Sequence, residues 1–86
     1  MDVSIIIVNY NTAQLTLQCI ESIYSKTSKL VYEIIVVDNA STDNSVELIR
    51  DKFPNVLLVQ SDVNLGFGRA NNLAYQSALG NYISVS

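Results

Sequence analysis

The chain has 86 residues, which is enough for one small domain and too few for two. Hydrophobic residues make up 49% and charged residues 15%, which excludes a disordered chain, and a net charge of −3 with five scattered basic residues argues against nucleic-acid binding. With no histidine and with Cys19 as the single cysteine, the sequence has neither a disulfide framework nor a cysteine-based metal site.

The first predicted element is a buried strand over Val3–Val8, VSIIIV, which is rich in β-branched residues and stops at a polar cluster. A helix of about three turns is expected next. Asn11 is predicted to cap this helix, with Gln14 three residues later as in a capping box. Its apolar stripe recurs at three- and four-residue steps, at Leu17, Ile20 and Tyr24, with Cys19 beside it as a core residue.

The second predicted strand contains four consecutive branched apolar residues, Ile34–Val37, which run directly into Asp38 and a polar loop. A run without polar alternation is typical of a strand that is covered on both faces of a parallel sheet. Open α/β sheets bind ligands outside the carboxyl ends of their strands, where Asp38 is expected to lie. Asp38 is therefore the first candidate for ligand binding.

A short helix is predicted after this loop, with Asn44 and Glu47 as a second capping-box pair and Pro54 at its end. Its apolar stripe consists of Val46, Ile49 and Phe53. The third apolar run, Val56–Val59, is expected to be another strand.

Ser61–Gly68 is predicted to be a loop that contains two glycines. The helix after it presents a face of small residues that suits close packing, at Ala70, Leu73, Ala74, Ser77 and Ala78. Gly80 is expected to end this helix in the left-handed conformation, and Tyr82–Ser86 begins a fourth strand.

Strands and helices alternate strictly along the chain, which predicts an α/β fold with three layers and a parallel sheet of four strands. The last predicted strand is followed by nothing, although the loop at its carboxyl end would form part of any site at that edge. We therefore expect residues 1–86 to be one portion of a larger domain.

Two interpretations of Asp38 stay open at this point. Its carboxylate could accept hydrogen bonds from a ribose hydroxyl or a base N–H, or it could cap the backbone of its own loop. The setting of parallel strands favours the ligand. For Ser41, Thr42 and Asp43, which could also face a nucleotide, helix capping and Asx turns are the favoured interpretation.

Asn9 and Tyr10 follow the first strand at the height of Asp38. The Tyr10 ring either packs against a flat base or covers the end of the core, and neither interpretation is preferred. The glycines Gly66 and Gly68 permit a close backbone approach to a ligand, but the third glycine of a dinucleotide motif is missing. Arg69 could reach a diphosphate or could simply be solvated.

The segments VSIIIVNYN, EIIVVDNASTDNS and NLGFGRANN, in this order and at these spacings, resemble the amino-terminal half of the catalytic domain of family 2 inverting glycosyltransferases, which have the GT-A fold. The rhamnosyltransferase-like branch is the most similar. The resemblance covers Val3–Ser86. It implies a nucleotide-binding half-domain with the strand order 3-2-1-4, and a nucleoside diphosphate sugar of the uridine or thymidine type as the donor.

The resemblance also implies roles for individual residues. The residues at the end of the first strand are implied to line the base and ribose. The aspartate at the end of the second strand is implied to bind the base or ribose, and NLGFGRANN is implied to lie near the diphosphate. Where family members often carry arginine this chain has Asn71, and Arg69 stands two residues earlier. The nucleotide-binding residues expected in this way are Val8, Asn9, Tyr10, Asp38, Asn39, Ser41, Gly66 and Arg69.

Family members continue with an Asp-x-Asp motif that holds a divalent metal, Mg or Mn, and with a carboxylate that serves as base for the acceptor hydroxyl. Neither lies within this sequence, so no metal or other cofactor, and no catalytic residue, is expected in this chain, and we expect it to be inactive alone. The alternative is a non-catalytic nucleotide-binding or interaction module of Rossmann-like or flavodoxin-like build.

We also expect a cytoplasmic setting, because the sequence has no disulfide framework and no signal-peptide pattern. No apolar run approaches the ~20 residues that span a bilayer, so membrane contact is not expected through this chain, although the full-length protein is expected at the inner membrane face. A further expectation is self-association through the exposed edge of the fourth strand.

Overall fold

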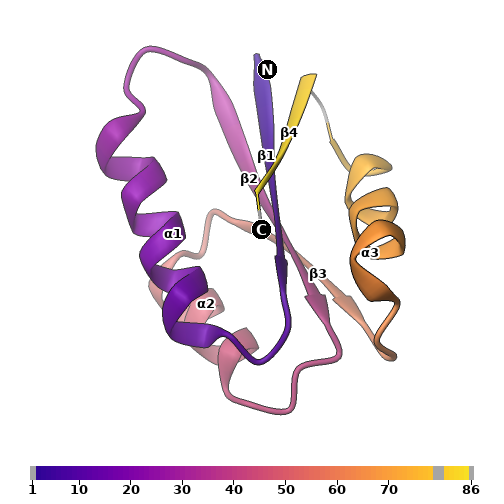
Figure 1. Cartoon of the computed structure of the whole chain (residues 1–86). Coiled ribbons are helices and arrows are strands. Elements are labelled where there is room, and N and C mark those ends of the chain that lie inside the picture. The colour runs from indigo at the N-terminus through magenta and orange to yellow at the C-terminus, as the bar shows by residue number, and fades with distance from the viewer. Residues whose placement is uncertain (1, 79–80, 86) are drawn as a thin grey trace.

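The computed structural model describes residues 2–78 and 81–85, and its strands and helices alternate along the chain (Figure 1). Their order is β1 (Val3–Asn9), α1 (Ala13–Lys26), β2 (Tyr32–Asn39), α2 (Ser45–Lys52), β3 (Leu57–Ser61), α3 (Gly66–Tyr75) and β4 (Asn81–Val85). The predicted Gly80 helix end, and Ser86 of the fourth strand, lie outside the described residues.

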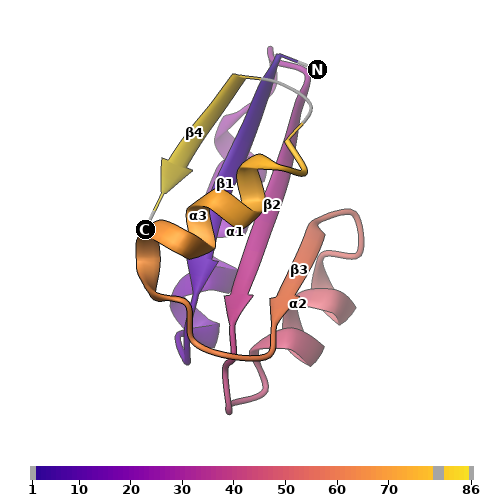
Figure 2. The ribbon, with the colours of Figure 1, turned by 90° about the vertical axis from the view of Figure 1, so that its right-hand side faces the viewer.

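The four strands form one sheet in the order β3-β2-β1-β4, and all three pairings are parallel. The turned view in Figure 2 shows the strands running in the same direction, with β3 and β4 at the two edges. The predicted α/β class with parallel strands is confirmed, and the order is the one that the family resemblance implies. In the register, Asn9 at the end of β1 lies beside Asp38 of β2, and Asp38 lies beside Gln60 of β3.

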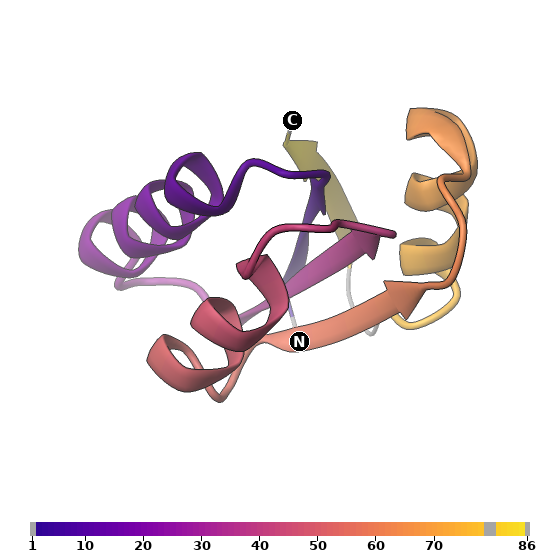
Figure 3. The same cartoon turned by 90° about the horizontal axis from the view of Figure 1, so that it is seen from below.

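The helices cover both faces of the sheet, with α1 and α2 on one side and α3 on the other (Figure 3). Alternate residues of β1 and β2 therefore enter two separate apolar clusters. On the α1 and α2 face the cluster contains Ile7, Leu17, Ile20, Ile34, Val36, Ile49 and Val56. On the α3 face it contains Ile6, Ile35, Val37, Ala70 and Ala74. Burial on both faces explains why the run Ile34–Val37 has no polar alternation.

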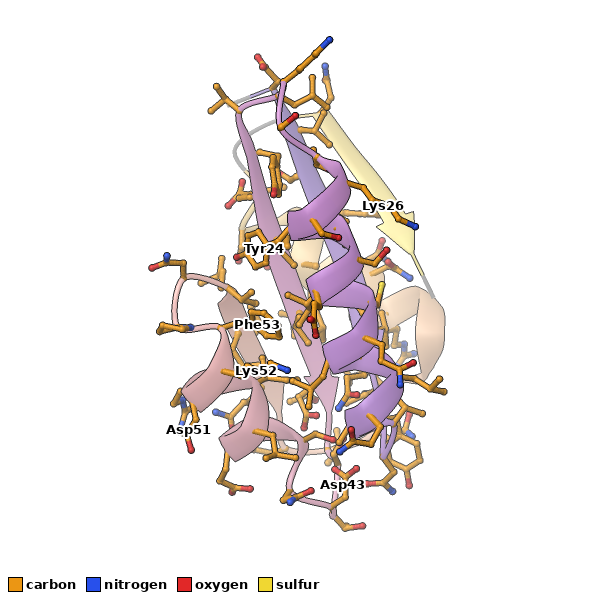
Figure 4. The ribbon with its side chains drawn as sticks, turned by 90° about the vertical axis from the view of Figure 1, so that its left-hand side faces the viewer. Tyr24, Lys26, Asp43, Asp51, Lys52 and Phe53 are labelled. Carbon is orange, nitrogen blue, oxygen red and sulfur yellow. The ribbon has the colours of Figure 1, made fainter. Side chains whose placement is uncertain are left out.

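An aromatic contact joins α1 to the end of α2. The rings of Tyr24 and Phe53 lie side by side with their centroids 5.7 Å apart (Figure 4). Nearby, Lys52 Nζ lies 3.4 Å from Glu21 Oε2, but both side chains are more than half exposed, so this ion pair contributes little stability. Apolar and aromatic contacts are therefore the main contribution to the packing of the two helices.

The predicted start of α3 and the predicted helix caps are wrong. α3 begins at Gly66, inside the stretch predicted to be a loop up to Gly68, and Leu65 is its N-cap residue. The predicted capping pairs also fail, because the N-cap residues Thr12 of α1 and Asn44 of α2 make no side-chain capping bond. In the described part of the chain no helix is long and apolar enough to cross a membrane.

Candidate functional site at the carboxyl ends of the strands

The turns that follow β1, β2 and β3 all lie on the side of the sheet where the strands have their carboxyl ends, because parallel strands end on the same side (Figure 3). We call this side the carboxyl edge. A pair of buried polar side chains joins the first two strands there. Asn9 Nδ2 donates to Asp38 Oδ1 over 2.8 Å, and Asn9 and Asp38 are 0% and 3% exposed. Asn9 Oδ1 accepts hydrogen bonds from the Thr12 hydroxyl over 2.9 Å and from the Thr16 hydroxyl over 2.6 Å. Asn9 is thus a fixed link between β1, β2 and the start of α1.

Asp38 is buried, and its carboxylate bonds within the protein. Its second oxygen, Oδ2, accepts a 3.0 Å hydrogen bond from the backbone N–H of Ser41, so both carboxylate oxygens have protein partners. The interpretation of Asp38 as a carboxylate that caps its own loop therefore describes what is observed, and its interpretation as a nucleotide-binding residue stays a prediction. The physical reason is burial, because a carboxylate withdrawn from water must find donors within the protein.

Asn11 does not cap α1 as predicted but reaches across to the loop after β2. Its backbone is in the left-handed region, with φ of 53°, and its Oδ1 accepts bonds from the N–H groups of Thr42 at 2.7 Å and Asp43 at 3.2 Å. Its own N–H donates to Ser41 Oγ over 3.0 Å. Asn11 thus joins the β1–α1 turn to the β2–α2 loop, both as an acceptor and as a donor.

A second asparagine ties β2 to the loop after β3. Asn39 is 3% exposed; its Nδ2 donates to Asn64 Oδ1 over 2.9 Å, and its Oδ1 accepts from the N–H of Leu65 over 2.6 Å. Asn64 Oδ1 also accepts from the N–H of Gly66, where α3 begins with φ of 75°. Burial of Asn39 makes the sequon Asn39–Ser41 a poor glycan acceptor.

Asp43 lies at the amino ends of two helices. Its Oδ1 accepts from the N–H of Ser45 at 3.0 Å and from the Ser45 hydroxyl. The Ser45 hydroxyl bond, followed by backbone N–H groups that include that of Ala13, holds the pKa of Asp43 below its ordinary value. The favoured interpretation of Asp43 as a cap is confirmed, although the residue expected to cap α2 was Asn44.

A cavity of about 550 Å³ opens beside the end of β1, within the size range of small-ligand sites. Its walls come from β1 and the turn after it, the first half of α1, the end of β2 and the β3–α3 connection. The lining residues are Ile7, Val8, Tyr10, Thr12, Leu15, Thr16, Cys19, Asn39, Asn64 and Gly66. Tyr10 and Leu15 present large apolar surfaces there, at 47% and 67% exposed.

The structure places only some of the predicted site residues at the cavity. Val8, Tyr10, Asn39 and Gly66 line the cavity, whereas the other four predicted residues, Asn9, Asp38, Ser41 and Arg69, are outside its described lining. Arg69 is exposed on the first turn of α3.

The sequence did not predict that residues of α1 line the cavity. Cys19 packs against the apolar cluster of the α1 and α2 face, as predicted, but it also lines the cavity; partial burial raises the pKa of its thiol. Leu15, also missed, lies beside the predicted stripe, and only the fold shows that this side of α1 borders the cavity.

The described side chains do not fit a divalent metal ion. No group of three or more His, Cys, Asp and Glu side chains in residues 2–78 and 81–85 is placed to hold one. At this edge Asp38 and Asp43 are engaged by backbone and side-chain donors, and Asp62, which follows β3, is exposed.

Residues 4–86 match the family model described as glycosyl transferase family 2. A poly(ribitol-phosphate) beta-glucosyltransferase of Bacillus spizizenii is 39% identical over 96% of this chain, which covers 14% of that protein. A UDP-Glc:alpha-D-GlcNAc-diphosphoundecaprenol beta-1,3-glucosyltransferase of Escherichia coli is 35% identical over 95% of this chain, which covers 33% of it. The chain thus spans a third or less of the length of these relatives.

Solved structures show the same arrangement. Residues 1–349 of S. aureus TarS, in complex with UDP, superpose with a TM-score of 0.86 and 26% identity over 99% of this chain and 27% of that one. The mannosyltransferase PcManGT from Pyrobaculum calidifontis, in complex with GDP-Man and Mn²⁺, gives a TM-score of 0.77 and 30% identity over 88% of this chain and 24% of that one.

Proposed function

Because this chain belongs to glycosyl transferase family 2, we propose that it forms the nucleotide-sugar-binding part of an enzyme that transfers a sugar, with inversion, from a nucleoside diphosphate to a hydroxyl acceptor. The observation that carries the proposal is the cavity of about 550 Å³ at the carboxyl end of β1, with the exposed Tyr10 ring in its wall. A parallel sheet offers its ligand site at this edge. The rhamnosyltransferase-like branch remains a prediction about the sugar.

The base and ribose are proposed to lie against Tyr10 and Val8. An aromatic face that is half exposed can stack on a flat base, and such stacking contributes about 1–3 kcal/mol per base. We assign Asn9, Asp38 and Asn39 a supporting role, because their polar atoms already bond within the protein. Asp38 has further lone pairs, so a direct bond to the base or ribose remains a prediction.

The diphosphate is proposed to lie near Gly66–Arg69. A helix amino terminus favours negative charge, and the first turn of α3 carries no acidic residue. At the start of α2, by contrast, Asp43 already provides a negative charge and accepts the Ser45 N–H. Arg69 is exposed on the first turn of α3, where it adds positive charge beside the proposed diphosphate.

Transfer requires a group that assists departure of the diphosphate and a base for the acceptor hydroxyl. Relatives such as PcManGT are seen with Mn²⁺. Asp38 and Asp43 at this edge are engaged within the protein, so we propose that the described residues supply binding and that catalytic groups come from outside them.

Titration calorimetry of the protein with uridine and thymidine diphosphates, against adenosine diphosphate and flavin mononucleotide, tests the proposal. We expect the first two to bind and the last two to bind at least tenfold more weakly, because the resemblance implies a pyrimidine donor. Equal affinity for all four, or a preference for the flavin, would favour the Rossmann-like or flavodoxin-like alternative.

Association of two copies through β4 also stays a prediction. Within the described residues β4 pairs only with β1, so its outer edge is an unpaired row of backbone groups. Light scattering over a range of concentrations would show it as a molecular mass that rises with concentration. A constant monomer mass would contradict it.

A further inference from the structure

Asn11 occupies a position in the β1–α1 turn that few residue types can fill. Its φ of 53° lies in the left-handed region, which glycine and asparagine adopt more readily than other residues. Asn11 is also exposed, so apolar packing does not hold it. Its hydrogen bonds to the neighbouring loop are therefore its main structural contribution.

These bonds connect two loops whose residues are about thirty positions apart in the sequence. The Asn11 amide oxygen accepts from two consecutive N–H groups, those of Thr42 and Asp43, while the Asn11 N–H donates to the Ser41 hydroxyl. The Ser41 hydroxyl also accepts from Asn9 Nδ2 over 3.2 Å. The turn is thus anchored to one loop at both Asn9 and Asn11.

Tyr10 lies between these two anchors and lines the cavity. Its ring is 47% exposed, so contacts with the core do not fully determine its position. We propose that Asn11 is a positioning residue for nucleotide binding: by joining the β1–α1 turn to the β2–α2 loop, it holds Tyr10 at the wall of the cavity. This inference rests on the proposed function of the cavity.

Two substitutions separate the effect of the Asn11 amide oxygen from the effect of its positive φ. Asn11→Gly keeps access to positive φ and removes the acceptor, whereas Asn11→Asp keeps an acceptor oxygen and tolerates the same φ. If only the backbone conformation mattered, Asn11→Gly would bind as the wild type does. If the bonds to Thr42 and Asp43 matter, Asn11→Asp will bind as the wild type does and Asn11→Gly will not.

The test is calorimetric titration of both variants and the wild type with uridine diphosphate, together with amide hydrogen exchange by NMR. We expect Asn11→Gly to weaken binding about tenfold, because the turn that carries Tyr10 loses its bonds to Thr42 and Asp43, and Asn11→Asp to stay within about twofold. Exchange should accelerate at Thr42 and Asp43 in Asn11→Gly, but not at Ser41, whose N–H is held by Asp38.

Each remaining outcome counts against a specific statement. Unchanged affinity in Asn11→Gly overturns the inference, as does unchanged exchange at Thr42 and Asp43. An Asn11→Asp variant that binds as weakly as Asn11→Gly also overturns it, because the acceptor oxygen is then not what matters. If the wild type binds no uridine diphosphate, the proposed function fails first, and the positioning role fails with it.

Discussion

At the carboxyl edge of the sheet, the last residues of the strands differ sharply from the turns that follow them. Asn9, Asp38 and Asn39 are at most 3% exposed, and their side-chain polar atoms bond within the protein. Tyr10, the first residue after β1, is 47% exposed and lines the cavity. The ends of β1 and β2 therefore form a hydrogen-bonded frame, and the exposed Tyr10 in the turn lines the cavity together with Val8 and Asn39 of the strands.

The largest effect is expected from breaking the frame. Asp38→Ala leaves the Ser41 N–H without its acceptor and removes the nearer of the two acceptors of Asn9 Nδ2, so we expect it to lower the free energy of unfolding by about 3 kcal/mol. Urea denaturation followed by circular dichroism measures this loss. The matched control is the exposed carboxylate Asp62, whose change to alanine should stay within about 0.5 kcal/mol.

The opposite result would reassign Asp38. A variant that keeps wild-type stability but loses nucleotide affinity would show that this carboxylate serves the ligand and not the frame. The assignment of the strand ends to the frame would then be wrong for Asp38.

A smaller effect, on binding alone, is expected from the turn. Tyr10→Ala should weaken uridine diphosphate binding about tenfold through loss of stacking, with stability nearly unchanged because the ring is half exposed. Calorimetry and thermal denaturation measure the two quantities.

Tyr24 provides the matched control for this ring. It is 40% exposed but packs against Phe53, away from the cavity lining. Tyr24→Ala should cost stability and leave affinity unchanged. Equal effects of the two substitutions on affinity would contradict a specific role of Tyr10.

The smallest effect is expected from Asp43, whose carboxylate is exposed. The Ser45 hydroxyl and backbone N–H groups hold the pKa of Asp43 below its ordinary value of 3.8, so its ionised form stabilises the folded state above that pH. That contribution is lost as the pH falls through the lowered pKa of the folded state.

Asp43→Asn should therefore be slightly less stable than the wild type at neutral pH, with a loss well below that of Asp38→Ala. The difference should shrink as the pH falls below about 4. Thermal denaturation between pH 7 and pH 2.5 checks this. A difference that grows toward low pH would contradict the sign of the argument.

Much of the fold could be predicted from the sequence, because local pattern decides it. The β-branched run Val3–Val8 and the uninterrupted run Ile34–Val37 are strands, each extended slightly in the structure, and strict alternation with helices leads to a parallel sheet. The start of α3 was misplaced because glycines at Gly66 and Gly68 disfavour a helix.

The site was predicted less well, because its bonds join residues far apart in the sequence. Asn11 and Asp38 carry the local signals of a helix cap and a ligand-binding carboxylate, but Asn11 bonds residues about thirty positions away and Asp38 bonds Asn9. Capping rules consider only neighbours within one turn. Such rules identify polar residues near the ends of strands and helices, but they do not identify a hydrogen-bond partner that is distant in the sequence.

The central claim is that the cavity at the end of β1 holds a nucleotide. The most direct test is a titration of the ¹⁵N-labelled protein with uridine diphosphate, followed by NMR. We predict that amide shifts concentrate at Val8, Tyr10 and Gly66, with little change at the opposite end of the sheet around Lys29. Absence of shifts at saturating nucleotide, or shifts concentrated around Lys29, would contradict the claim.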